Sequence, residues 1–135
     1  MKIDRVVTLA TAYIEDPNGN VLLLKRGTKS SLSGHWQFAE GKIETGEFPD
    51  DTLEREVSEE LSVPIIKMVF KTVSHVFFET PGVVFFIQRV VYLTKLESKD
   101  IKLSDEHVDC GWFTKEELLR LQLVPGVREV IEAVG

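Results

Sequence analysis

The sequence predicts a mixed α/β fold built as one domain over residues 1–135. Three observations support this prediction. About six stretches have the β-branched and apolar composition of strands, an acidic helix pattern lies between them, and helix patterns also end the chain. The hydrophobic content of 43% and the charged content of 28% are ordinary for a globular protein of this length. Strands interrupted by a helix favour a mixed sheet that helices cover.

The N-terminal region reads as two strands and a loop. Arg5–Tyr13 and Val21–Lys25 are apolar and rich in β-branched residues, and the turn signal Asp16–Asn20 separates them. We therefore expect these two strands to form a hairpin. Arg26–Ser33 is a polar loop, and His35–Phe38 is a short alternation of polar and aromatic residues that leads into a glycine turn.

A helix is predicted from Pro49 to about Ser62. Pro49 suits the first helical position, where no backbone donor is needed, and Pro64 biases Val63 away from helical geometry. The apolar stripe of this helix consists of Leu53, Val57 and Leu61. Ser62 falls at the C-terminal cap, a position that often takes a left-handed backbone.

Three glutamates share one face of this helix, because Glu56, Glu59 and Glu60 stand at i, i+3 and i+4. Like charges at these spacings destabilise a helix by about 0.2–0.5 kcal/mol per pair. We expect a partner outside the helix to offset this cost, and a hard divalent cation with oxygen ligands fits that role. Glu56 and Glu60 lie beside the apolar stripe, which favours the edge of a cleft over a solvated face. A surface helix rich in glutamate is the alternative.

The second half of the chain reads as strands followed by short helices. Ile65–Glu79 and Val83–Leu96 are long strand patterns separated by Thr80-Pro81-Gly82, which predicts a hairpin. Residues 83–87 are apolar throughout, so we expect them to be buried on both faces. The remaining predicted elements are a strand over Val108–Phe113, a helix through Leu121 with Thr114 and Glu117 as its capping box, and a last helix that Pro125 begins.

Charge and cysteine content narrow the functional classes. The formal net charge of −6 argues against general nucleic-acid binding, which favours a basic surface. It does not argue against a small anionic substrate, because metal ions can lie between acidic side chains and phosphates. No apolar run is long enough to span a bilayer, and the charged N-terminus lacks the plan of a signal peptide. Cys110 is the only cysteine, which agrees with a cytoplasmic location.

The stretch from Gly41 to Val63 resembles the signature of the Nudix hydrolases. In one-letter code this signature is Gx5Ex7REUxEExGU, where x is any residue and U is an apolar residue. The positions that match in register are Gly41, Glu47, Arg55, Glu56, Val57, Glu59, Glu60 and Val63. Ser62 stands where the family usually has glycine, and Phe38-Ala39-Glu40-Gly41 stands where members often have an apolar residue and Pro-Gly-Gly. The resemblance implies an α/β/α sandwich with a mixed central β-sheet.

The resemblance also implies a metal site. Glu56, Glu59 and Glu60 match the metal-binding glutamates of the signature, and the backbone carbonyl of Glu40 matches a further ligand. The expected ion is Mg²⁺, with Mn²⁺ as an alternative. Glu106, on a late loop, is a further candidate ligand.

Catalytic roles follow from the same resemblance. Arg55 matches the arginine that orients the glutamates, and Glu47 matches a glutamate that supports the metal site. Similar enzymes take their general base either from the helix, which here would be Glu56, or from a late loop, where Glu106 is the best candidate and Asp105 the next. A solvated acidic loop is the alternative for Glu106.

Substrate contacts are expected from three residues. Lys25 or Arg26 is the candidate for binding phosphates, as a basic residue at this place does in similar proteins, and a solvated loop is the alternative. Phe38 is interpreted first as a structural residue and second as a stacking surface for a base, since aromatic faces accept any nucleobase.

The predicted activity is Mg²⁺-dependent hydrolysis of a phosphoanhydride bond in a nucleoside diphosphate linked to another group, with a nucleoside triphosphate as the leading candidate. Diadenosine polyphosphates and nucleoside diphosphate sugars stay open as substrates. The rival functions are a catalytically weak, Nudix-like nucleotide-binding module and an unrelated acidic-helix protein that binds Ca²⁺ or a basic partner. No motif carboxylate is missing, which favours catalysis. The oligomeric state, including a homodimer, is open.

Overall fold

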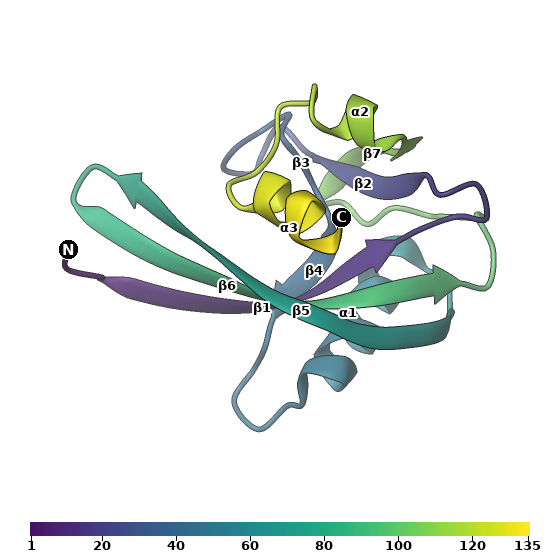
Figure 1. Ribbon diagram of the computed structural model, residues 1–135, viewed down its shortest axis with the longest axis horizontal. Coiled ribbons are helices and arrows are strands. Elements are labelled where there is room, and N and C mark those ends of the chain that lie inside the picture. The colour runs from purple at the N-terminus through teal and green to yellow at the C-terminus, as the bar shows by residue number, and fades with distance from the viewer.

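Ten helices and strands make up the chain in the computed structural model, which describes residues 1–135. In chain order they are β1 (Arg5–Ile14), β2 (Val21–Arg26), β3 (Trp36–Gln37), β4 (Ala39–Lys42), α1 (Pro49–Leu61), β5 (Ile65–Thr80), β6 (Val83–Leu96), β7 (His107–Phe113), α2 (Lys115–Leu118) and α3 (Val127–Val134). Figure 1 shows how these elements are arranged in space. None of the helices combines the length and the apolar composition that crossing a membrane requires.

The larger sheet has the strand order β4-β1-β6-β5 and is mixed, as the sequence predicts. Strands β1 and β6 run parallel, whereas β4 pairs with β1 and β5 pairs with β6 in antiparallel fashion. The predicted hairpin of β5 and β6 is confirmed. A parallel pair needs a long crossover connection, and here the connection from β1 to β6 includes the acidic helix α1.

The predicted hairpin of β1 and β2 is wrong. Strand β2 lies in a second, antiparallel sheet of order β3-β2-β7, and a single bridge between Glu15 and Val21 joins its start to the end of β1. The physical reason is that β4 and β6 already occupy both hydrogen-bonding edges of β1. The Asp16 carboxylate accepts hydrogen bonds from the backbone N–H groups of Asn18 and Asn20, which turns the chain out of the first sheet.

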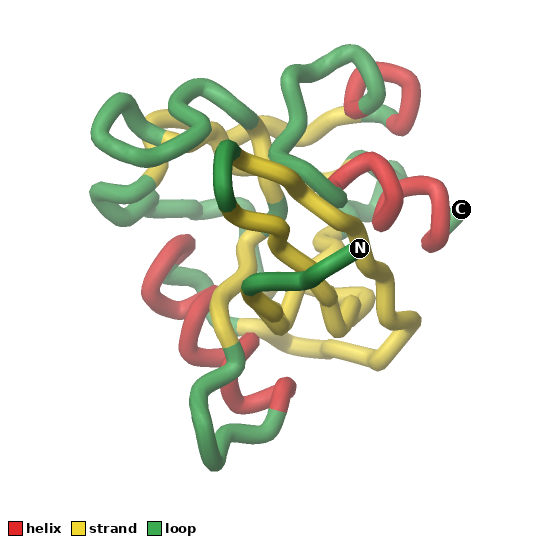
Figure 2. The backbone as a smooth tube through the Cα atoms, turned by 90° about the vertical axis from the view of Figure 1, so that its left-hand side faces the viewer, coloured by secondary structure: helices red, strands yellow, loops and turns green.

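The strands form a layer between α1 on one side and α2 and α3 on the other, as Figure 2 shows. Each side has its own apolar core. The core under α1 contains Ala10, Ala12, Ile14, Leu22, Leu24, Ala39, Leu53, Val57 and Leu61. The core under α2 and α3 contains Tyr13, Val21, Leu23, Phe38, Val91, Leu118, Val127, Val130 and Ile131. This arrangement is the predicted α/β/α sandwich.

The hairpin of β5 and β6 extends beyond the helices as an arm (Figure 1). Residues 83–87 lie on this arm, and all of them are half-buried. The prediction that this stretch is buried on both faces is therefore wrong, because an apolar run reports composition and not whether a helix covers the strand.

The ends of α1 agree with the sequence. Pro49 occupies the first turn, and Phe48 at the N-cap makes no side-chain capping hydrogen bond. Ser62 at the C-cap has φ 57° and ψ 31°, which is the predicted left-handed conformation. The two later helices are shorter than predicted. The capping box of Thr114 and Glu117 forms, but α2 ends at Leu118, and α3 begins at Val127, after Gly126 with φ 92° and not at Pro125.

Candidate active site

The carboxylate of Glu60 lies almost completely inside the protein, with 3% of the residue exposed. It lies on the last turn of α1, beside the apolar stripe that packs on the strands. Its Oε2 atom accepts a hydrogen bond of 3.1 Å from the backbone N–H of Glu40 on β4. Burial, together with the negative charges of Glu56, Glu40 and Glu106, raises the pKa of Glu60 to about 9. Glu60 forms no ion pair with a lysine or arginine.

Glu56 lies one helical turn earlier, against Gly41 on β4. A Cβ atom on Gly41 would overlap the Glu56 carboxylate, so any other residue here would force this side chain to move. Burial raises the pKa of Glu56, although the hydrogen bond from Arg55 acts in the opposite direction. The signature glycine therefore makes room for a signature glutamate.

Arg55 and Glu47 form a fixed pair at the N-terminal side of these glutamates. The guanidinium of Arg55 donates to both carboxylate oxygens of Glu47, at 3.2 and 3.0 Å, and to Glu56 Oε1 at 2.8 Å. Glu47 also accepts from the backbone N–H of Glu44 and the hydroxyl of Thr52, each at 3.0 Å. The Arg55 guanidinium, with these other donors, lowers the pKa of Glu47 to about 2. Glu59 is more exposed and lies 3.7 Å from Arg55.

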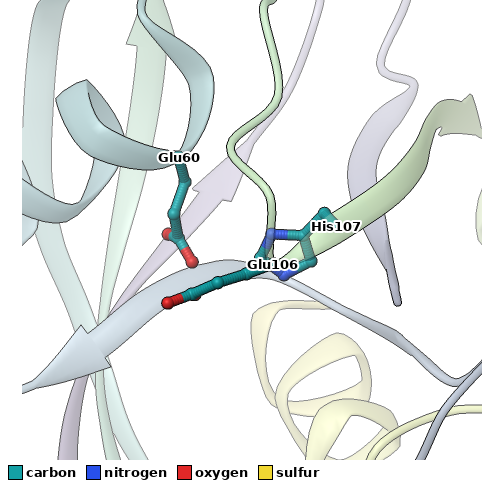
Figure 3. A group of neighbouring side chains, drawn as sticks. All are labelled: Glu60, Glu106 and His107. Atoms are coloured by element: carbon teal, nitrogen blue, oxygen red, sulfur yellow. The ribbon is translucent and has the colours of Figure 1, made fainter. Parts of the chain in front are cut away.

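The late loop places Glu106 beside Glu60 (Figure 3). The backbone N–H of Ser104 donates to the carbonyl of Glu60, at 3.3 Å, and that of Gly27 donates to the carbonyl of Glu106, at 3.1 Å. These bonds fix the loop to the end of α1 and to the residue after β2. One ligand atom from each of Glu60, Glu106 and His107 lies within 4.8 Å of the other two. Glu106 is exposed, whereas the other two are buried.

His107 is a site residue that the sequence analysis did not identify. Only 5% of it is exposed, and its Nδ1 atom is buried without a hydrogen-bond partner. Burial lowers the pKa of His107, which favours a neutral imidazole. The available signal was its position next to Glu106, the acidic residue chosen as a site candidate.

Glu40 uses its side chain in a way that the sequence did not indicate. Its carboxylate accepts hydrogen bonds from Arg89 Nε at 2.9 Å, Arg89 Nη2 at 3.2 Å and Thr11 Oγ1 at 2.8 Å. Arg89 is only 2% exposed. A buried charge pair of this kind explains why the chain has glutamate where the family often has glycine. The available signal was Arg89 itself, a charged residue in the middle of the mostly apolar strand β6.

The three expected substrate contacts lie in different surroundings. Phe38 is 0% exposed and packs against Tyr13 with the ring centroids 5.6 Å apart, so no face of its ring is open to a base. The first interpretation of Phe38, as a structural residue, is therefore confirmed, and the alternative of a stacking surface is wrong. Lys25 lies with Nζ 5.9 Å from the centre of the Trp36 ring. Arg26 donates from Nε to the Ser31 carbonyl and from Nη1 to Gln37, each at 2.7 Å, which anchors the loop that follows β2.

The donor set fits a divalent cation. Glu60 is buried without a counter-ion from the protein, Glu56 and Glu106 add negative charge to it, and His107 offers an unpartnered nitrogen. An uncompensated buried charge is costly, so such a group either keeps a proton or binds a cation. Oxygen and nitrogen atoms at this separation can ligate one ion after a small closure of the side chains.

Comparisons with known proteins identify the family of this chain. The family model of the NUDIX domain matches residues 6–134. The CTP pyrophosphohydrolase of Escherichia coli (strain K12) is 30% identical over 132 residues, which cover 96% of this chain and 91% of that protein. The 8-oxo-dGTP diphosphatase of Proteus vulgaris is 36% identical over 70 residues, which cover 51% of this chain and 62% of that relative.

Solved structures give the same result at the level of the fold. The crystal structure of a MutT protein from Methanosarcina mazei Go1 has a TM-score of 0.77 and 26% identity, covering 98% of this chain and 96% of that chain. A MutT NUDIX hydrolase from Burkholderia pseudomallei has a TM-score of 0.80 and 25% identity, covering 96% and 98%. The chain therefore belongs to the Nudix hydrolase family and is a hydrolase that acts on phosphoanhydride bonds in nucleotides.

Proposed function

We propose that this protein is a Mg²⁺-dependent pyrophosphohydrolase that cleaves a nucleoside triphosphate into a nucleoside monophosphate and pyrophosphate. The observation that carries the proposal is the buried carboxylate of Glu60, which lies beside Glu106 and has no counter-ion from the protein. A divalent ion would compensate this charge and at the same time attract the phosphates of a nucleotide.

The proposed ligands are the carboxylates of Glu56, Glu59 and Glu60 and the backbone carbonyl of Glu40, and Glu106 is the alternative ligand in case it is not the base. Mg²⁺ prefers oxygen ligands of this kind, and Mn²⁺ accepts them as well. When bound, the ion would neutralise phosphate oxygens and lower the pKa of a water molecule. The rigid helix α1 and the hydrogen bond from Glu40 to Glu60 hold the carboxylates in place.

The remaining residues position these groups and move the proton. Arg55 orients Glu56 through its charge-assisted hydrogen bond, and Glu47 fixes Arg55 by accepting two bonds from it. Glu106 acts as the general base and accepts a proton from the attacking water at its carboxylate oxygen. It suits this role because it is exposed and lies on a loop. Glu56 is the alternative base.

Basic residues at the end of β2 are the proposed phosphate contacts. Arg26 is fixed by Ser31 and Gln37, and its positive charge acts on His107, so it lies close enough to the site to favour an anionic substrate. Lys25 is the neighbouring candidate, although its amine lies towards the Trp36 ring.

A nucleoside triphosphate is the leading substrate because both named relatives point to one. One of them is named for CTP and the other for 8-oxo-dGTP. Diadenosine polyphosphates and nucleoside diphosphate sugars are the alternative substrates. A nucleotide-binding module without turnover is the alternative function, and the full set of motif carboxylates speaks against it.

A nucleotide panel tests the proposal. Phosphate release is measured with Mg²⁺ for ordinary and oxidised nucleoside triphosphates, diadenosine polyphosphates and nucleotide sugars, with and without inorganic pyrophosphatase. We expect phosphate from a triphosphate only when pyrophosphatase is present, because the product is pyrophosphate. Binding of nucleotides without turnover of any of them would contradict the proposal and favour the binding module.

Three further proposals concern the domain organisation, the cellular location and the oligomeric state. A single domain over residues 1–135 agrees with the match to residues 6–134. A cytoplasmic location stays a prediction from the composition, and the homodimer stays a prediction that size-exclusion chromatography with light scattering can test.

A further inference from the structure

We propose that His107 supplies a nitrogen ligand to the metal site, so that this enzyme binds Mn²⁺ through a mixed set of oxygen and nitrogen donors. The inference rests on the proposed metal-dependent function and deepens it, because the signature on α1 and β4 provides oxygen ligands alone. It assigns a role to a residue outside that signature and predicts which divalent ion the site prefers.

The first observation is the unpartnered nitrogen of His107. Nδ1 is buried and has no hydrogen-bond partner, and the residue is 5% exposed. Leaving a buried polar atom without a partner is costly, so native proteins rarely retain such an atom without a use. An ion bound by the imidazole would give one of its ring nitrogens a partner.

The second observation is where the imidazole lies. One of its nitrogens is within 4.8 Å of carboxylate oxygens of both Glu60 and Glu106, and Figure 3 shows the three side chains converging from α1, the late loop and β7. No hydrogen bond joins His107 to either side chain, although carboxylate oxygens are hydrogen-bond acceptors. The three groups surround a common point instead of pairing with one another, which is the arrangement of metal ligands.

The third observation is that the backbone around His107 is fixed. His107 pairs with Arg26 in the sheet of β2 and β7, and its backbone N–H donates to the Ser104 carbonyl at 3.3 Å. The positive charge of Arg26, which acts on His107, is held by Ser31 and Gln37. The imidazole therefore keeps its place without a competing partner, as a preorganised ligand must.

The donor set determines which metal ions fit. Imidazole nitrogen suits transition metals, whereas Mg²⁺ selects oxygen ligands and usually retains several waters. Mn²⁺ accepts carboxylates and imidazole together. We therefore expect His107 to contribute to Mn²⁺ binding much more than to Mg²⁺ binding.

The test uses the full-length protein loaded with Mn²⁺ and no nucleotide. Pulsed electron paramagnetic resonance detects ¹⁴N nuclei bound to Mn²⁺, and calorimetry gives the affinities for Mn²⁺ and Mg²⁺. The chain has 3 histidines, so each can be replaced in turn. His107→Gln is the test variant, and His35→Gln and His75→Gln are matched controls outside the acidic cluster.

The wild type and both controls should show the nitrogen signal, and His107→Gln should lose it. His107→Gln should also weaken Mn²⁺ binding by at least about tenfold, with a smaller effect on Mg²⁺. Bound Mn²⁺ without a nitrogen signal in the wild type, or with a signal that survives in His107→Gln, would overturn this inference and leave the proposed function intact.

Absence of any Mn²⁺ or Mg²⁺ binding would overturn the inference together with the metal-dependent function. If His107→Gln does not fold, wild-type protein labelled with ¹⁵N-histidine replaces it. The nitrogen frequencies should then change to those of ¹⁵N, and unchanged ¹⁴N frequencies would overturn the inference.

Discussion

Glu40 and Glu60 are two buried carboxylates that lie side by side, yet only Glu40 has a cationic partner within the chain. Glu40 is 8% exposed and Glu60 is 3% exposed, and the backbone N–H of Glu40 donates to the Glu60 side chain. Glu40 receives two hydrogen bonds from the buried guanidinium of Arg89. Glu60 receives none from any cation, and its pKa rises to about 9.

A cationic partner within the chain distinguishes a structural carboxylate from a reactive one. Burying a charge is costly, and a buried ion pair offsets that cost only when both partners are well placed. Where the fold needs the charge, as at Glu40, the chain provides its own arginine. Where the chain provides no cation, as at Glu60, the carboxyl either keeps a proton or takes a cation from outside the chain.

The largest expected effect is that of Glu60→Gln on activity. We expect kcat to fall by more than about 10⁴-fold, because charge neutralisation and water activation fail together when a ligand on a rigid helix is lost. Steady-state rates at saturating Mg²⁺ measure this. The control is Glu54→Gln, an exposed glutamate of the same helix outside the signature, which should keep its activity. A loss below tenfold in Glu60→Gln would show that its uncompensated charge does not serve catalysis.

Glu106→Gln comes next and tests whether the exposed member of the cluster is the base. Removing a general base costs about 10²–10⁴-fold in rate, so kcat should fall within that range with little change in the Mg²⁺ requirement. Mg²⁺ titrations of the rate separate the two effects. A fall in Mg²⁺ affinity equal to that of Glu60→Gln would instead make Glu106 mainly a ligand, and Glu56 would become the base to test.

Arg89→Met tests the compensated member of the pair through stability. Removing one partner of a buried ion pair costs about 3–5 kcal/mol, because the other charge is left alone. Denaturant unfolding should show this loss in Arg89→Met and a smaller loss in the double variant Glu40→Gln/Arg89→Met, which also removes the orphaned charge. Equal destabilisation of the single and double variants would mean that packing, and not charge compensation, explains the pair.

The smallest expected effect is that of Ser62→Gly at the end of α1. Ser62 has a left-handed backbone with φ 57°, which costs serine more than glycine. We expect the free energy of unfolding to change by no more than about 0.5 kcal/mol, in the stabilising direction, with turnover unchanged. Lost turnover at unchanged stability would reveal a contact of Ser62 that the backbone argument does not include.

The sequence predicted those parts of the site and fold that local patterns determine. The spacing of Glu56, Glu59 and Glu60, the proline at the start of α1 and the cap at Ser62 all act within a few residues. The capping box of Thr114 and Glu117 is local as well. Each of these features was predicted with the correct element type, because the physical cause lies within the same stretch of chain.

Features that depend on distant contacts could not be predicted in the same way. The partner of β1 depends on which strands reach its edges. The turn at residues 16–20 therefore did not determine whether β1 and β2 pair as a hairpin. The Glu40–Arg89 pair joins residues 49 positions apart. The burial of His107 likewise depends on what packs above it, which a short pattern does not record.

If a divalent metal is the missing counter-ion of Glu60, Mg²⁺ titration of metal-stripped protein will show it. Because burial raises the pKa of Glu60 to about 9, its carboxyl keeps a proton at pH 7 and must release it when the metal binds. Calorimetry in two buffers of different ionisation enthalpy measures this release. It should be about one proton per Mg²⁺ at pH 7 and should disappear as the pH rises through about 9. Binding in the wild type without proton release, or unchanged binding and release in Glu60→Gln, would contradict the account.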